Sequence, residues 1–259
     1  METSSTNIDI KSYDGVLSLG AWCQVGAAIR FRELSYVNSP IHNFGIKTWQ
    51  NLMDILETRF EFYWEKENMA IGDVEEGYSA KYDDKRPVYK VYCNRYNMLS
   101  NHHFDVCDNE PGSLLTYDGF KERMDLLSEI FLVQCATYES VLFALKIFSV
   151  NGTTTISKED LIRLCKVLNQ LREGKSYDLR ISVPKDFYDQ TLQYITETPE
   201  LSHILLYSWT IEWNDDTKNE EWQWMLDDVR LNPNHLQHLN TEIIGLEEIS
   251  WEDMKYLNS

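Results

Sequence analysis

The stretch VLSLGAWC, residues 16–23, sets the interpretation of the fold. Its first four residues, 16–19, form a short apolar run, which predicts a buried strand. Gly20 allows a sharp turn of the backbone, and apolar residues at helical spacing predict a helix over residues 22–34. A strand, a glycine turn and a helix therefore follow one another directly, and Cys23 stands where the helix opens.

The position of Cys23 suits a thiol nucleophile. A helix N-terminus presents free backbone N–H groups and a partial positive charge, which stabilise a thiolate and can hydrogen-bond the oxyanion of a tetrahedral intermediate. The same position also suits a small residue packed beneath a helix. Cys23 is therefore the first candidate for chemistry, with an inert buried cysteine as the alternative.

Further elements follow in the first half of the chain. Apolar residues three or four apart predict helices over residues 46–60 and 120–131. Residues 65–86 are acidic and interrupted by glycine, which predicts an irregular surface segment. Two β-like segments, residues 88–93 and 98–106, are separated by a short polar turn and predict a hairpin.

The second half alternates strands and helices. Strands are predicted over residues 140–148, 178–183 and 203–209, with helices over residues 158–172 and 185–194 between them. Such alternation favours right-handed crossovers and a sheet with helices on both faces. We expect an α/β fold, a three-layer αβα arrangement around a mixed, largely parallel sheet.

The chain has 259 residues, of which 43% are hydrophobic, enough for one sizeable core. No repeat or low-complexity linker divides it, so we expect a single domain over residues 1–259 with a polar flexible leader at residues 1–13. The leader carries acids rather than a basic segment followed by an apolar one, so it lacks the pattern of a secretory signal. The alternative is a domain boundary near residue 151.

Charge and cysteine content restrict the partners. The chain has 24 Lys and Arg against 42 Asp and Glu, a formal net charge of −18. This field repels nucleic acid and anionic membranes, so we expect neither as a partner. We expect a small-molecule, acyl or peptide substrate instead. The five cysteines are odd in number and widely spaced, which fits a reducing, cytoplasmic location. The sequence makes no prediction of the oligomeric state.

A cysteine nucleophile needs a base, usually a histidine that is near in space rather than in sequence. The doublet His102-His103 stands out among the six histidines. In an extended segment the two side chains point to opposite faces, so one of them addresses a given site. His102 is the candidate base, or His103 if the register differs. The alternative is a pair of loop histidines bonded to nearby carboxylates.

One short stretch contains four potential metal ligands, Cys93, His102, His103 and Cys107. Their spacing matches no compact zinc pattern, and adjacent histidines rarely bind one tetrahedral ion. Phosphate-binding and dinucleotide-binding glycine motifs are also absent from the sequence. We therefore expect no metal and no cofactor.

Three motifs carry a resemblance to a known family. Ser18-Leu19-Gly20 followed by Cys23, then Pro40-Ile41-His42-Asn43, then His102-His103-Phe104 resemble the mainly bacterial family of putative papain-like cysteine peptidases. Members typically have Ser-Leu-Gly-x-x-Cys-x-x-Ala, then Pro-Phe-Asp-Trp, then His-Asp-Phe. The resemblance covers the first half of the chain best. It also implies an alternative fold, an α+β papain-like architecture.

The resemblance implies roles for individual residues. The family cysteine falls on Cys23 and the family histidine on His102. Candidates for binding or orienting the substrate are Ser18, Gly20, Trp22, His42 and Asn43.

Three of the departures from the family pattern bear on the site. Gly26 replaces the alanine, and His42 and His103 replace the two aspartates. From Cys23 as nucleophile and His102 as base, we expect a cysteine-dependent hydrolase or acyltransferase that acts through a thioester on Cys23. The alternative is a non-catalytic binding protein that retains the fold.

Overall fold

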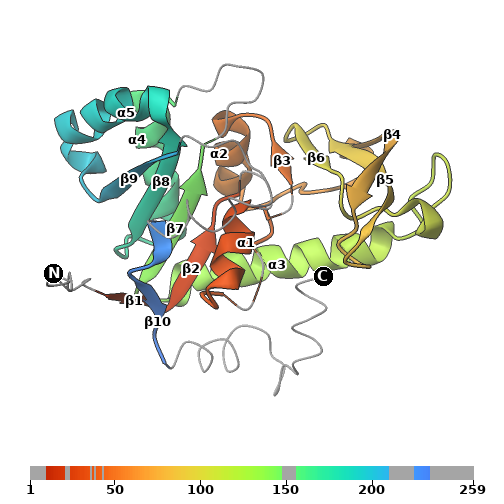
Figure 1. The fold of residues 1–259 in the computed structure, drawn as a ribbon, viewed down its shortest axis with the longest axis horizontal. Helices are drawn as coiled ribbons and strands as arrows, with labels where there is room; N and C mark the ends of the chain where they lie inside the picture. The colour runs from red at the N-terminus through yellow and green to blue at the C-terminus, as the bar shows by residue number, and fades with distance from the viewer. Residues whose placement is uncertain are drawn as a thin grey trace, which may run out of the picture.

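The computed structural model describes residues 10–20, 24–35, 37, 39–42, 44–147, 156–209 and 225–233. Its centre is a parallel sheet with the strand order β2-β7-β8-β9 (Figure 1). These strands are β2 (Gly15–Ser18), β7 (Val141–Lys146), β8 (Asp178–Pro184) and β9 (Ile204–Trp209). The predicted α/β class and the predicted parallel strands are confirmed.

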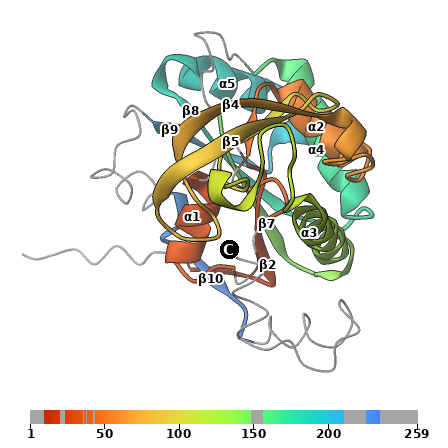
Figure 2. The same cartoon turned by 90° about the vertical axis from the view of Figure 1, so that its right-hand side faces the viewer.

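Helices cover both faces of this sheet (Figure 2). On one face, Leu142 and Ala144 of β7 join a buried cluster with α1 (Gln24–Phe31). On the other, Phe143 and Leu145 pack in a larger cluster with the remaining helices. These are α2 (Trp49–Glu57), α3 (Tyr117–Thr137), α4 (Lys158–Leu171) and α5 (Lys185–Glu197). The alternation of side chains along a strand therefore produces the three predicted layers.

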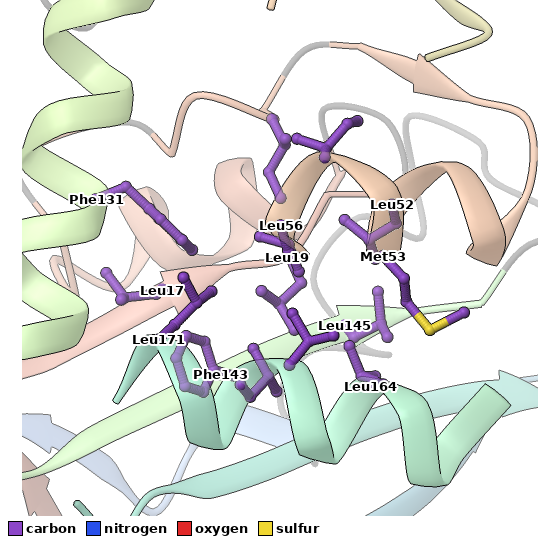
Figure 3. Packing of buried hydrophobic residues seen from close by; sticks show 14 of the residues in the cluster. Leu17, Leu19, Leu52, Met53, Leu56, Phe131, Phe143, Leu145, Leu164 and Leu171 are labelled. Carbon is purple, nitrogen blue, oxygen red and sulfur yellow. The ribbon is translucent and has the colours of Figure 1, made fainter. Parts of the chain in front are cut away.

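The larger cluster forms the main core (Figure 3). Leucines from β2, α2, β7 and α4 meet there around Phe131 of α3 and Phe143 of β7. Full burial of each such side chain contributes about 1.5–3 kcal/mol relative to exposure. The labelled members in the view are Leu17, Leu19, Leu52, Met53, Leu56, Phe131, Phe143, Leu145, Leu164 and Leu171.

A second, antiparallel sheet lies beside the parallel one, and α3 runs along both (Figure 1). Its strand order is β3-β6-β5-β4. The strands are β3 (Gly45–Ile46), β4 (Met69–Tyr78), β5 (Lys85–Cys93) and β6 (Met98–Ser100). The combination of a parallel and a separate antiparallel sheet also agrees with the α+β alternative.

The prediction that residues 65–86 are irregular is wrong. Most of this segment belongs to β4 and the start of β5, which pair from Met69 opposite Cys93 to Tyr78 opposite Lys85. No side chain of β4 is fully buried, so its sequence lacks the apolar alternation that marks a strand. Hydrogen bonds to β5 specify β4 instead.

The predicted hairpin of residues 88–93 and 98–106 is confirmed, with a shorter second strand. β5 and β6 pair through Cys93 opposite Met98 and Val91 opposite Ser100. After Ser100 the chain leaves the sheet and returns to it at Asp105, which bridges to Val88. His102 and His103 therefore lie in a turn rather than in a strand.

Two polar contacts fix α4. Ser157 accepts from the backbone N–H of Asp160, whose carboxylate accepts from the N–H of Ser157, a capping box that begins the helix. At its end, the buried guanidinium of Arg172 donates to four backbone carbonyls at 2.5–3.1 Å, those of Cys135, Tyr138, Glu139 and Ser176. Arg172 thus connects the end of α3 to the chain that enters β8.

A short pair of parallel strands completes the fold, β1 (Lys11–Tyr13) with β10 (Val229–Leu231). Among the described helices, none combines the length and apolar character that a bilayer crossing requires. The single-domain prediction stays a prediction, and the alternative boundary near residue 151 lies outside the described residues.

Candidate functional site

The loop after β2 begins with a strained turn. Gly20 has φ +84°, and its backbone N–H donates to the hydroxyl of the buried Ser18 at 3.2 Å. A Cβ on residue 20 would lie 3.2 Å from the carbonyl oxygen of Ile41. Both the dihedral angle and this close approach favour glycine. Ser18 and Gly20 therefore shape the turn that leads toward α1.

The described chain resumes at Gln24, the first residue of α1. The predicted order of strand, glycine turn and helix is confirmed on both sides of this gap. Ala21, Trp22 and Cys23 lie outside the described residues, as does Asn43. The predicted roles of Cys23, Trp22 and Asn43 therefore stay predictions.

His42 packs directly on α1. Its side chain is buried, and a Cβ on Gly26 would come within 2.0 Å of the His42 Nδ1 atom. The absence of a side chain at Gly26 thus creates the space that the imidazole fills. Gly26 and His42 both depart from the family pattern, and the structure brings them into contact.

The environment of His42 keeps its ring neutral. Burial lowers the pKa of His42 to about 3, and the positive charges of Arg30 and His102 act in the same direction. A guanidinium nitrogen of Arg30 lies 3.4 Å from Nε2 of His42. Because a guanidinium only donates, Nε2 accepts and the proton of the neutral ring is on Nδ1.

His102 has the tautomer of a general base. Its Nδ1 atom lies 2.7 Å from the backbone carbonyl oxygen of Tyr78, which only accepts. Nδ1 therefore carries the proton, and Nε2 has a free lone pair. Burial lowers the pKa of His102, opposed by the bond to Tyr78 and by the charge of Glu75. The neutral, proton-accepting form thus predominates at neutral pH.

His103 is packed as a structural residue. Its Nδ1 atom lies 2.8 Å from the hydroxyl of Ser100, and its ring stacks on Phe44 with centroids 4.9 Å apart. The ring of Phe120 lies beside it at 5.4 Å. Burial first, and then the charges of Arg123 and the other two histidines, lower the pKa of His103 well below its ordinary value.

The three histidines converge although they come from two distant segments. The charge of His102 lowers the pKa of His42, and the charges of both lower that of His103. The rings of His102 and His103 are 6.5 Å apart and nearly perpendicular. His42 joins this group to the first turn of α1 through Gly26. Phe44, two residues after His42, stacks on His103, so the segment that carries His42 lies against the segment that carries His102 and His103.

The four described cysteines are free thiols, and three of them are buried. Cys93, Cys135 and Cys165 are buried, and burial raises the pKa of Cys135 to about 12 and that of Cys165 to about 11. Cys107 is exposed, with a guanidinium nitrogen of Arg86 at 3.7 Å. Among the described residues, no group of three or more His, Cys, Asp and Glu side chains gathers as a metal site.

The sequence did not predict two contacts of the site. The Tyr78 carbonyl that orients His102 ends β4, in the segment predicted to be irregular. The contact between Gly26 and His42 joins residues of two separate motifs. Its only signal was that both positions depart from the family pattern together.

Comparisons with known proteins give one match. The family model described as putative papain-like cysteine peptidase (DUF1796) matches residues 14–184, which include β2, α1, the antiparallel sheet and all three converging histidines. Neither the search of curated proteins nor that of solved structures found a match. The family match covers more than half of the chain, and the matched residues include each motif on which the resemblance depends. The chain belongs to the family of putative papain-like cysteine peptidases.

Proposed function

We propose that this protein is a cysteine-dependent hydrolase or acyltransferase that acts through a thioester on Cys23. The observation that supports the proposal most is the position of His102. Its neighbour His103 stacks on Phe44, two residues after the His42 that packs on Gly26 in the first turn of α1. In the sequence, Cys23 directly precedes Gln24, the first residue of α1.

In the proposed reaction, Nε2 of His102 accepts the thiol proton of Cys23. The thiolate attacks the acyl carbon, and the tetrahedral intermediate collapses with departure of the leaving group, which receives the proton from His102. Attack on the thioester by water gives hydrolysis, and attack by an amine gives acyl transfer. The carbonyl of Tyr78 orients His102, the part that a carboxylate plays in many related sites.

The substrate class follows from charge and family. We infer a small-molecule, acyl or peptide substrate, and the net charge of −18 favours one that carries positive charge. The four described thiols are unpaired, which supports the reducing environment of the cytoplasm.

A non-catalytic binding protein is the second candidate. The observation that favours it is the packing of the half-buried His103 ring against Phe44 and Phe120, at the position of a family aspartate. A protein in which both family aspartates are replaced can retain the fold of the site and still have lost the catalytic activity.

Acylation by p-nitrophenyl acetate separates the two candidates. An enzyme is expected to release a burst of p-nitrophenol and to carry one acetyl group, mapped to Cys23 by mass spectrometry. Cys23→Ala should abolish the burst, and His102→Ala should slow it by roughly 10²–10⁴-fold. Cys107→Ala, which removes an exposed thiol, is the matched control and should leave the burst unchanged. Equal acetylation of Cys23 and Cys107 would favour the binding protein.

A further inference from the structure

An open pocket of about 550 Å³ lies at the amino edge of the parallel sheet. Its walls are the end of α4, the loop from α4 to β8, and the short helix η3 (Pro199–Leu201) that precedes β9. Tyr177 and His203 line it and directly precede β8 and β9, which places them at the amino ends of both strands. The pocket has the size of a small-molecule site.

This pocket is separate from the candidate functional site. The four strands of the sheet are parallel, so the loop that follows β2 begins at the opposite, carboxyl edge. In Figure 1, α4, β8 and β9 also lie at the end of the molecule opposite the antiparallel sheet, which carries the loop of His102. A ligand in the pocket therefore does not occupy the place of the proposed acyl substrate.

The walls of the pocket are fixed by contacts with one another. The hydroxyl of Tyr177 donates to the backbone carbonyl of Cys165 at 3.0 Å, which ties the loop before β8 to α4. The Tyr177 ring meets that of His203 edge to face, with centroids 5.0 Å apart, and so joins the loop to the start of β9. The carbonyl of Ser176 accepts from the buried Arg172 at 2.9 Å. The pocket is therefore preformed, so a ligand need not order the loop when it binds.

Apolar side chains make up one part of the lining. Ile162 is 40% exposed, and Tyr177 presents a half-buried aromatic ring. Cys165 and Leu201 of the same lining are buried. A ligand that covers Ile162 and Tyr177 removes apolar surface from water, which favours an apolar or aromatic body.

Two lysines give the pocket a local excess of positive charge. Lys166 is exposed and makes no ion pair within the described part of the chain. Lys175 pairs with the carboxylate of Glu139 at 2.9 Å, but the Glu139 side chain is 84% exposed, so solvent weakens this pair and an anion can compete with it. Glu200 is the one acidic residue of the lining, and it is exposed. In a chain with a net charge of −18, two lysines against one glutamate favour a ligand of negative charge.

We propose that this pocket binds a small molecule that combines an aromatic or apolar body with one anionic group. The body packs against Ile162 and Tyr177, and the anionic group binds Lys166 and Lys175. The proposal assigns a second binding site to the chain and does not depend on Cys23 or on any reaction there.

Anilinonaphthalene sulfonate (ANS) is a suitable probe, because it joins an aromatic body to a sulfonate. N-phenylnaphthylamine has a similar body without the charge and is the matched neutral probe. In fluorescence titrations of the full chain, we expect wild type to bind one ANS molecule with saturation. Lys166→Gln combined with Lys175→Gln should weaken the binding of ANS by roughly tenfold and that of the neutral probe by less than about twofold. Lys85→Gln combined with Lys185→Gln is the control, because it removes the same charge from two exposed lysines outside the pocket.

A second pair of variants tests the place of binding. Asn169→Trp fills the pocket from an exposed position of α4 and should weaken the binding of both probes by roughly tenfold or more. Gln170→Trp adds the same side chain at the next exposed position, outside the lining, and should leave both affinities unchanged.

Three results would overturn the proposal. The first is that folded wild type binds no ANS, and the second is that Asn169→Trp binds it as tightly as Gln170→Trp does. The third is that the two lysine pairs weaken ANS equally, since the pocket lysines would then have no specific part in binding the anion.

Discussion

The imidazole of His42 lies directly over Gly26, where a single added methyl carbon would come within 2.0 Å of Nδ1. Both residues are buried, so neither the helix nor the ring can move away without disturbing the core around α1. Interiors are packed tightly enough that such an overlap forces a shift of side chain or backbone. The contact thus makes the two positions dependent on each other.

Gly26→Ala is therefore expected to destabilise the fold by about 1–3 kcal/mol, because the new methyl group overpacks the site. His42→Ala in the same chain should restore most of this loss, since it removes the ring that the methyl group meets. Chemical denaturation of the two single variants and the double variant measures the coupling.

Gly119→Ala in α3 is the control for helix propensity and should be neutral or stabilising by up to about 1 kcal/mol. Additive effects of Gly26→Ala and His42→Ala would show that the contact is absent.

Acid should weaken the fold through His42. Its pKa is about 3 in the folded protein and about 6.5 in the unfolded chain, so only the unfolded chain binds a proton between these values. The contribution is complete above pH 6.5 and is lost as the pH falls toward 3. The stability lost between neutral pH and pH 5 is about 2 kcal/mol.

The free energies of unfolding of wild type and His42→Ala at pH 7 and pH 5 test this. The wild type should lose about 2 kcal/mol more than the variant on acidification, because other titrating groups contribute to both. Equal losses would mean that His42 is protonated or exposed in the folded protein.

The rate of acylation should depend on the ionisation of His102. Since burial lowers the pKa of His102, the neutral base persists below its ordinary pKa of about 6.5. The acid limb of the pH–rate profile is therefore expected to lie below pH 6.5. Tyr78 contributes through its backbone carbonyl, so Tyr78→Phe should leave the profile in place. An acid limb above pH 7 would argue against His102 as the base.

Arg172 is expected to be the most sensitive charged residue of the core. Arg172→Met would leave four backbone carbonyls without their donor, so we expect a loss of at least about 3 kcal/mol. Arg163→Met is the matched control, because its ion pairs with Asp54 and Glu57 are partly exposed and should contribute about 1 kcal/mol or less. Urea denaturation compares the two, and similar losses would contradict the account of Arg172.

Local patterns predicted the parallel part of the fold. Strand β2 is buried on both faces, so residues 16–19 form a continuous apolar run that is visible in the sequence. The capping box of Ser157 with Asp160 is equally local, since its two residues are three positions apart. Such signals depend only on neighbouring residues and therefore needed no knowledge of the fold.

Long-range contacts accounted for what was missed. Strand β4 is held by hydrogen bonds to β5. None of its side chains is buried, so its sequence shows no alternation of apolar and polar residues. The orientation of His102 depends on the carbonyl of Tyr78, which is 24 positions away. The sequence suggested His102 and His103 equally on geometric grounds. Only the contacts of each ring distinguish His102, oriented by the Tyr78 carbonyl, from His103, stacked on Phe44.

The measurement that tests the central claim most directly is the rate of alkylation of Cys23 by iodoacetamide across pH, with Cys107 in the same molecule as an exposed reference thiol. Mass spectrometry of the labelled peptides reports both rates at once. The account predicts that Cys23 titrates with an apparent pKa below about 7.5 and reacts faster than Cys107 at pH 7. If Cys23 follows the same pH dependence as Cys107, or reacts only after unfolding, Cys23 is not the nucleophile.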